Sequence, residues 1–279
     1  IITLINSIYI NNPYIFISYM FSVIAATMTT KIGIKVIQKY NFLQNIRTEG
    51  PSSHLIKKNT PTMGGLFIIP IFFLILLCAK IISFKFKLVL LITISGFFSI
   101  GFLDDYLSIK KQINLGLKSK EKLILQIFFS SFFVIFLFNN NLINNNLNFL
   151  NDLTINLKSF IIPISIITII SLSNSVNLTD GLDGLAAGCS SIAFCGLGTE
   201  ILLNNNKSYL IFSLLSFCLS GLCLGFLKHN KYPAKIFMGD TGSLTIGAII
   251  GIICVVTNSF FTTFIISGIF VIEAVSVII

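Results

Sequence analysis

The sequence has few charged residues and no tryptophan. Only 10% of its 279 residues are charged, whereas 54% are hydrophobic and 28 are Phe. Soluble domains carry about 25% charged and about 45–50% apolar residues. The shortage of charge, the long apolar runs and a mean hydropathy of +0.93 argue against a secreted scaffold, a disordered chain or a nucleic-acid-binding domain. The composition therefore predicts an all-α, polytopic membrane protein.

Cysteine is also scarce in any informative pattern. The six Cys all lie in apolar stretches, with no CxxC pair and no Cys/His cluster at zinc spacing. Neither a disulfide framework nor a zinc site is indicated. We expect the cysteines to be buried packing residues.

Nine segments are apolar enough to cross a bilayer as helices, which needs about 20 residues each. They form one predicted integral-membrane domain over residues 1–279. Pairs of Gly four residues apart, at Gly221 and Gly225 and at Gly247 and Gly251, are expected to pack helices closely. The nine ranges are 14–33, 63–79, 88–103, 123–138, 159–176, 184–203, 209–227, 242–257 and 259–279.

The basic residues select an orientation for these spans. With the N-terminus outside, 14 of the 19 Lys and Arg fall on the inner side and 5 on the outer side. The positive-inside rule therefore predicts a periplasmic N-terminus. The net charge of +9 is then a one-sided band. It either records topology alone or also attracts anionic lipids and phosphorylated substrates.

Five of the six Asp fall at cytoplasmic helix ends in this topology. The first two, Asp104 and Asp105, are adjacent where the third span leaves the membrane. Neighbouring carboxylates repel, so either one acts as a base or a divalent cation neutralises the pair. A plain polar helix terminus is the alternative for this pair.

A second polar segment runs from Asn174 to Gly188. Asn174, Asn177 and Asp180 share one helical face if the fifth span continues that far. Asp183 could also cap the sixth helix, whose N-terminus favours an anion. The alternative is an interhelical turn with Gly184 and Gly188 as a small-residue packing face.

A third segment contains Phe237 and Asp240, just before the eighth span. Asp240 is a candidate Mg²⁺ ligand, and Phe237 could stack on a nucleobase. The alternative is a helix cap beside an aromatic residue at the membrane edge. A fourth loop, residues 50–65, offers His54, Lys57 and Lys58. Carboxylates for Mg²⁺, lysines for phosphates and an aromatic residue for a base suit phosphoryl transfer.

The motifs resemble those of a known enzyme family. Gly-Pro-x-Ser-His with Thr-Pro-Thr-Met-Gly-Gly, Phe-Leu-Asp-Asp-Tyr, Asn-Leu-Thr-Asp-Gly-Leu-Asp-Gly-Leu and Phe-Met-Gly-Asp-x-Gly-Ser-Leu are similar, in order and spacing, to bacterial phospho-N-acetylmuramoyl-pentapeptide-transferases. These belong to the polyprenyl-phosphate N-acetylhexosamine-1-phosphate transferase superfamily. The resemblance runs from about Arg47 to Ile279.

The resemblance implies Mg²⁺-dependent transfer of phospho-MurNAc-pentapeptide from UDP-MurNAc-pentapeptide to undecaprenyl phosphate, which gives lipid I and UMP. It also implies a ten-helix homodimer in the bacterial inner membrane with a cytoplasmic active site. By motif, Asp104 would be the base, Asp105 its partner and Asp240 the main Mg²⁺ ligand. Asp104 and Asp105 are further candidate Mg²⁺ ligands. The residues implied at the nucleotide pocket and phosphates are Asn177, Asp180, Asp183, Phe237, Lys57 and Lys122.

The sequence departs from the family pattern in two places. Ser108 stands where the family has Lys, for which Lys110 or Lys111 could substitute. A His-rich loop and a tenth helix are also expected beyond Ile279, so we interpret the sequence as C-terminally incomplete.

Two alternatives remain from the sequence. One is a UDP-N-acetylglucosamine donor, and the other is a transporter or non-catalytic membrane remnant. Glu273, an acid inside the ninth span, is expected to face the bundle interior.

Overall fold

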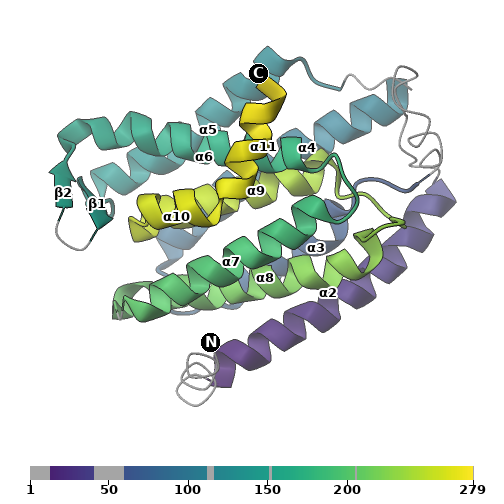
Figure 1. Cartoon of the computed structure of the whole chain (residues 1–279), viewed down its shortest axis with the longest axis horizontal. Coiled ribbons are helices and arrows are strands. Elements are labelled where there is room, and N and C mark those ends of the chain that lie inside the picture. Colours follow the sequence, from purple (N-terminus) through teal and green to yellow (C-terminus); the bar gives the residue numbers. More distant parts are fainter. Residues whose placement is uncertain (1–12, 41–59, 112–115, 151–152, 205, 279) are drawn as a thin grey trace.

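The computed structural model describes residues 13–40, 60–111, 116–150, 153–204 and 206–278. Helices dominate this part of the chain, which confirms the predicted all-α class (Figure 1). A two-stranded antiparallel hairpin is the one sheet there. The elements are α2 (Pro13–Tyr40), α3 (Gly65–Cys78), α4 (Phe84–Lys111), α5 (Ser119–Asn139), β1 (Asn146–Leu150), β2 (Leu153–Asn156), η2 (Lys158–Phe160), α6 (Ile161–Thr179), α7 (Leu185–Leu203), η3 (Lys207–Tyr209), α8 (Leu210–Asn230), α9 (Gly239–Thr257), α10 (Phe260–Ile266) and α11 (Gly268–Ile278).

Seven helices in the described residues are long and apolar enough to cross a membrane. They coincide with seven of the nine predicted ranges, and the protein is therefore a multi-pass membrane protein. The range 63–79 holds the 14-residue helix α3, which spans about 21 Å against about 30 Å of hydrocarbon. The range 259–279 divides at Ser267 into α10 and α11. In Figure 1, α11 turns away from the direction of α10 and crosses beside α6.

Helix α9 lies at the centre of the bundle. Within its most apolar 18-residue window, 89% of the residues are buried. Its close packing on α6 depends on glycine, because a Cβ at Gly251 would lie 2.7 Å from the Cα of Ile169. Gly225 on α8 meets α2 in the same way, with an added Cβ 2.8 Å from the Cβ of Ala26. The predicted packing role of both glycine pairs is confirmed.

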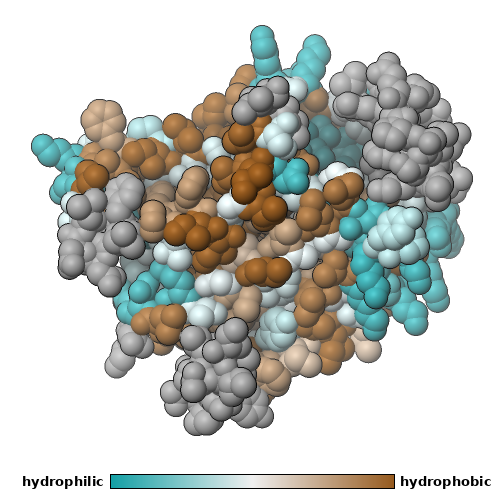
Figure 2. Space-filling model, in the orientation of Figure 1, coloured by the Kyte–Doolittle hydropathy of each residue, from teal (hydrophilic) through white to brown (hydrophobic). Residues whose placement is uncertain are grey.

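The helix ends that carry the polar motifs meet at one end of the bundle, on the right in Figure 1. The hairpin of β1 and β2 lies at the opposite end. Figure 2 shows the hydrophobic side chains of this face gathered across its middle, with hydrophilic ones toward both ends. Such a belt fits a bilayer between two aqueous surfaces.

The cysteine prediction is only partly correct. Cys218, Cys223 and Cys254 are buried, but Cys78 and Cys195 are exposed. An apolar stretch in a membrane helix can face lipid as readily as it faces protein, so apolar surroundings in the sequence do not imply burial.

Candidate functional site

The N-terminus of α9 is capped by a carboxylate from another helix. Its own N-cap residue, Met238, makes no side-chain capping bond. Instead Asp105, on α4, accepts the backbone N–H groups of Asp240 at 3.0 Å and Thr241 at 2.9 Å, and the Thr241 hydroxyl at 2.6 Å. Both Asp105 oxygens are therefore engaged. A carboxylate here satisfies unpaired N–H groups and complements the helix dipole.

Asp180 supports the turn that leads into α9. Gly239 has a φ of +72°, a conformation that glycine adopts without strain. The Asp180 carboxylate accepts the Gly239 backbone N–H. Burial, followed by the nearby negative charges of Asp240 and Asp105, raises the pKa of Asp180 well above its usual value.

Lys122, on α5, joins two carboxylates at the centre of the site. Its Nζ lies 2.6 Å from Oδ2 of Asp240 and 3.1 Å from Oδ1 of Asp104. Asp104 also accepts the backbone N–H of Leu117 at 2.9 Å. The ammonium group offsets the repulsion between these two acids, which come from α4 and α9.

Asn177 completes the contacts of Asp240. Helix α6 continues to Thr179, as the Asn174, Asn177 and Asp180 spacing requires. The Asn177 amide nitrogen donates to Oδ1 of Asp240 at 2.8 Å and to the Ser243 hydroxyl at 2.9 Å. The two Asp240 oxygens thus have different partners, Asn177 and Lys122.

One turn deeper in the membrane, Gln126 and Asn174 form a reciprocal amide pair. Asn174 Nδ2 donates to Gln126 Oε1 at 2.8 Å, and Gln126 Nε2 donates to Asn174 Oδ1 at 3.3 Å. Gln126 is only 1% exposed. Since it follows Lys122 by four residues and Asn174 precedes Asn177 by three, the pair ties α5 to α6 directly below the charged cluster.

The segment 231–238 lies beside the cluster through backbone bonds. Phe237 donates its N–H to Pro61 and accepts from Gly64, at 2.8 and 2.9 Å. The predicted cap by Asp183 is wrong: the N-cap of α7 is Gly184, in a left-handed conformation, and Asp183 Oδ2 accepts the Ala234 N–H at 3.1 Å. The tight turn at Gly184 directs this carboxylate toward segment 231–238 instead.

Buried Asn230 holds the same region together. It accepts the Gly184 N–H at 3.1 Å and donates to the Ile236 carbonyl at 2.9 Å. Sequence reasoning missed Asn230 and Gln126. The signal for Gln126 was a lone amide in an apolar helix, where an unpaired polar group is costly. Asn230 ends α8 among Lys228, His229 and Lys231, and no comparable signal marks it.

Comparison with known proteins identifies the family of this chain. The Glycosyl transferase family 4 model matches residues 87–258, and the phospho-N-acetylmuramoyl-pentapeptide-transferase signature 1 matches residues 57–69. A phospho-N-acetylmuramoyl-pentapeptide-transferase of Prochlorococcus marinus (strain MIT 9301) is 55% identical over 99% of this chain and 78% of its own length. The chain belongs to this transferase family. A Synechococcus (strain CC9605) member is 34% identical over 97% of this chain and 78% of its own length.

Membership of the transferase family confirms the resemblance. It does not test the roles predicted for individual residues. Lys57 lies outside the described residues. Near the departure at Ser108, Lys111 donates to the Gly116 carbonyl at 3.3 Å rather than to an acidic side chain. Glu273 is partly exposed and lies within electrostatic range of Cys189 on α7.

The carboxylates of the acidic cluster could supply oxygen ligands for a cation. In the described part of the chain, no three His, Cys, Asp or Glu side chains are arranged as a complete metal site. Asp104 and Asp240 nevertheless face one shared cation, the Lys122 ammonium. Mg²⁺ is commonly held by one or two carboxylates, with waters and substrate phosphates as the other ligands. The donor set therefore fits Mg²⁺ once a phosphorylated substrate contributes.

An apolar groove runs along α6 beside this cluster. Its volume is about 620 Å³, and α9, α10 and α11 contribute the rest of its lining. Asn174 and Leu178 line it, so the groove approaches Asn177 and the acidic cluster. Its walls include Ile167, Ile170, Phe260, Phe264, Val271 and Val275.

Proposed function

We propose that this chain transfers phospho-MurNAc-pentapeptide from UDP-MurNAc-pentapeptide to undecaprenyl phosphate and forms lipid I and UMP. This is the first membrane step of peptidoglycan synthesis. The observation that carries the proposal is the bridge from Lys122 to Asp104 and Asp240, at a helix end where four separate motifs meet. Among the alternatives, family membership favours a MurNAc-pentapeptide donor.

The proposal includes the orientation in the bacterial inner membrane. We place the active site on the cytoplasmic face, because Lys110, Lys111, Lys118 and Lys120 lie near it and the positive-inside rule puts such residues inside. This corresponds to nine crossings, with the N-terminus outside, and to α10 and α11 together acting as the ninth. We also propose that the protein forms a homodimer in the lipid bilayer.

Two regions would hold the substrates. The nucleotide would lie against Asn177, Asp180, Asp183 and Phe237, with Lys57 on its phosphates. The polyprenyl chain would lie in the apolar groove along α6, whose lining extends from Ile167 to Leu178 of that helix. This arrangement brings the lipid phosphate beside Lys122, because Asn174 and Leu178 line the end of the groove next to Asn177.

Of the two routes, direct attack by the lipid phosphate or transfer through a phospho-aspartate, we propose direct attack, a single displacement. An oxygen of the lipid phosphate forms a bond to the sugar-linked phosphorus of the donor, the pyrophosphate bond breaks, and UMP leaves with the electron pair of that bond. Mg²⁺, held by Asp104 and Asp240, would neutralise charge on the phosphates. Lys122 orients the phosphates and stabilises the charge that develops. Asp104 accepts any proton carried by the attacking phosphate.

The role of Asp105 differs from that of Asp104 in this proposal. Its oxygens already accept three hydrogen bonds from Asp240 and Thr241. We therefore assign Asp105 to holding α9, and thereby Asp240, in position. This assignment replaces the prediction that Asp104 and Asp105 both bind Mg²⁺.

The test is UMP release by the full-length protein with undecaprenyl phosphate and Mg²⁺. UDP-MurNAc-pentapeptide should support release, and excess UDP-N-acetylglucosamine should not compete. Preferential use of UDP-N-acetylglucosamine would transfer the proposal to that donor. A protein that binds neither nucleotide would be a transporter or a non-catalytic remnant.

A further inference from the structure

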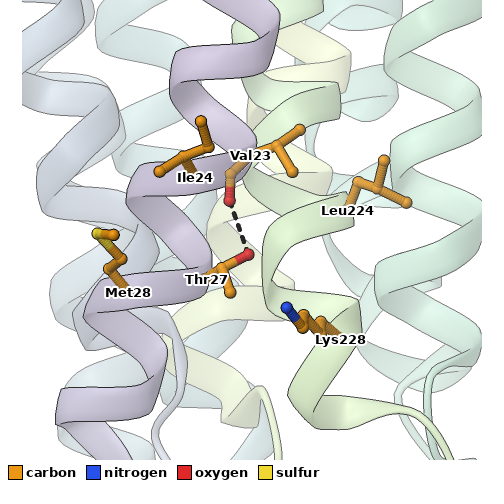
Figure 3. Close-up of a pocket in the computed structure, with 6 residues that line it drawn as sticks. All are labelled: Val23, Ile24, Thr27, Met28, Leu224 and Lys228. Atoms are coloured by element: carbon orange, nitrogen blue, oxygen red, sulfur yellow. Dashed lines mark hydrogen bonds between the residues drawn. The ribbon is translucent and has the colours of Figure 1, made fainter.

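A second groove lies between α2 and α8, away from the acidic cluster (Figure 3). Its volume is about 470 Å³, and its lining consists of Val23, Ile24, Thr27, Met28, Leu224 and Lys228. None of these residues belongs to the proposed catalytic or nucleotide-binding set. The groove faces outward, because Ile24 and Met28 are 52% and 62% exposed.

The walls of this groove offer few free polar groups. Thr27 is its one uncharged polar side chain, and its hydroxyl donates to the Val23 carbonyl at 2.8 Å, as drawn in Figure 3. The same hydroxyl also lies 3.4 Å from the Gly225 carbonyl oxygen. With Thr27 already bonded within the protein, the walls favour hydrocarbon.

Positive charge gathers at one end of the groove. Lys228 follows Leu224 by one turn of α8, and Lys31 follows Thr27 by one turn of α2. The ring of His229 donates to the Thr27 carbonyl at 3.1 Å and lies within electrostatic range of Lys31, Lys228 and Lys235. These cations therefore surround the point where the two helices leave the groove.

This charge has no acidic partner within the described ranges. The ion pairs found there join Lys122 to Asp104 and Asp240, at the other side of the bundle. An apolar groove in a membrane protein that ends in unpaired cations is complementary to one kind of molecule, an amphiphile with a hydrocarbon chain and a negative headgroup.

We infer that the groove between α2 and α8 binds an anionic phospholipid, with an acyl chain along Val23, Ile24 and Leu224 and the headgroup phosphate on Lys228. Lys31 and Lys235 add positive charge around the phosphate. The inference goes beyond the proposed function, because the site is separate from the catalytic cluster. It rests only on the protein lying in a membrane.

Residues 1–279 contain no Trp, which allows a fluorescence test. In full-length protein in which any Trp outside residues 1–279 is replaced by Phe, Met28→Trp places a single fluorophore at the rim of the groove. The protein is reconstituted in vesicles that contain brominated phosphatidylglycerol or brominated phosphatidylcholine, whose acyl chains quench nearby Trp. Phosphatidylglycerol should compete for this position about fivefold better than phosphatidylcholine for each lysine that contacts it.

Three variants complete the design. Adding Lys228→Gln, at an exposed position, should remove most of the preference. Adding Lys39→Gln, an exposed lysine further along α2, should leave it unchanged. Ile192→Trp, 73% exposed on α7, should show no preference.

Two results would overturn the inference. Equal quenching by the two lipids at Met28→Trp would show that the cations select nothing. Protection of this Trp from both lipids would show that protein, such as a second copy of the chain, covers the groove. Neither result depends on UMP release, so the proposed function stands or falls separately.

Discussion

Lys122 on α5 and Asp240 on α9 form an ion pair in which the Lys122 nitrogen lies 2.6 Å from Oδ2 of Asp240. The two residues are 118 positions apart in the sequence. Their side chains are 18% and 23% exposed, and Asp104, the third member, is 13% exposed. Solvent therefore screens the cluster only in part, and removal of the lysine charge has large consequences.

Lys122→Met should lower the turnover of the transferase at least about a hundredfold, because the phosphates lose their fixed cation. The same change should tighten Mg²⁺ binding, by about tenfold, because Asp104 and Asp240 lose the ammonium that competes with the metal. Titration of UMP release against Mg²⁺ separates the two effects. Lys120→Met, at an exposed position two residues earlier, is the control and should change neither value.

Asp105 and Asp104 should differ in what their removal does. Asp105→Ala leaves the N–H groups of Asp240 and Thr241 without their acceptor, so we expect a loss of about 3 kcal/mol in the free energy of unfolding. Asp104→Ala should cost less than half of that while abolishing turnover. Thermal unfolding in detergent micelles measures the first effect. Equal stability losses for the two variants would contradict the assignment of Asp105 to α9.

This division between two adjacent acids shows where sequence reasoning stops. The apolar runs predicted nine spans, because membrane helices need about 20 apolar residues. Seven of them are long helices in the described residues, in the predicted order. The break at Ser267 was missed, since both halves are equally apolar. The motifs identified Asp104, Asp180 and Asp240 as one site. The packing of α4 against α9 decides which of the two acids contacts Lys122 and which caps α9. Local sequence does not encode this packing.

The amide pair of Gln126 and Asn174 should act as one unit. Gln126→Leu and Asn174→Leu should each lower turnover about tenfold with little change in the Michaelis constant for UDP-MurNAc-pentapeptide, because the pair positions Lys122 and Asn177 without touching the nucleotide. The double variant should lose little more than either single variant, which gives a coupling free energy of about 1 kcal/mol. Purely additive losses would rule out a shared positioning role.

Gly101 should be intolerant of a side chain. An added Cβ would overlap the carbonyl oxygen of Asp240, so Gly101→Ala has to separate α4 from the start of α9. We expect a stability loss of about 1–3 kcal/mol together with loss of turnover. Gly268→Ala is the matched control, because nothing lies within 4 Å of its added Cβ. A Gly101→Ala protein with normal activity would show that this contact does not position Asp240.

The most direct measurement is UMP release from UDP-MurNAc-pentapeptide and undecaprenyl phosphate, with Mg²⁺, by full-length protein carrying Asp240→Ala. Asp240 contacts both Lys122 and Asn177, so its removal dismantles the proposed centre. We predict that release falls at least about a hundredfold while the protein remains folded in the membrane. Unchanged release in Asp240→Ala would contradict the site.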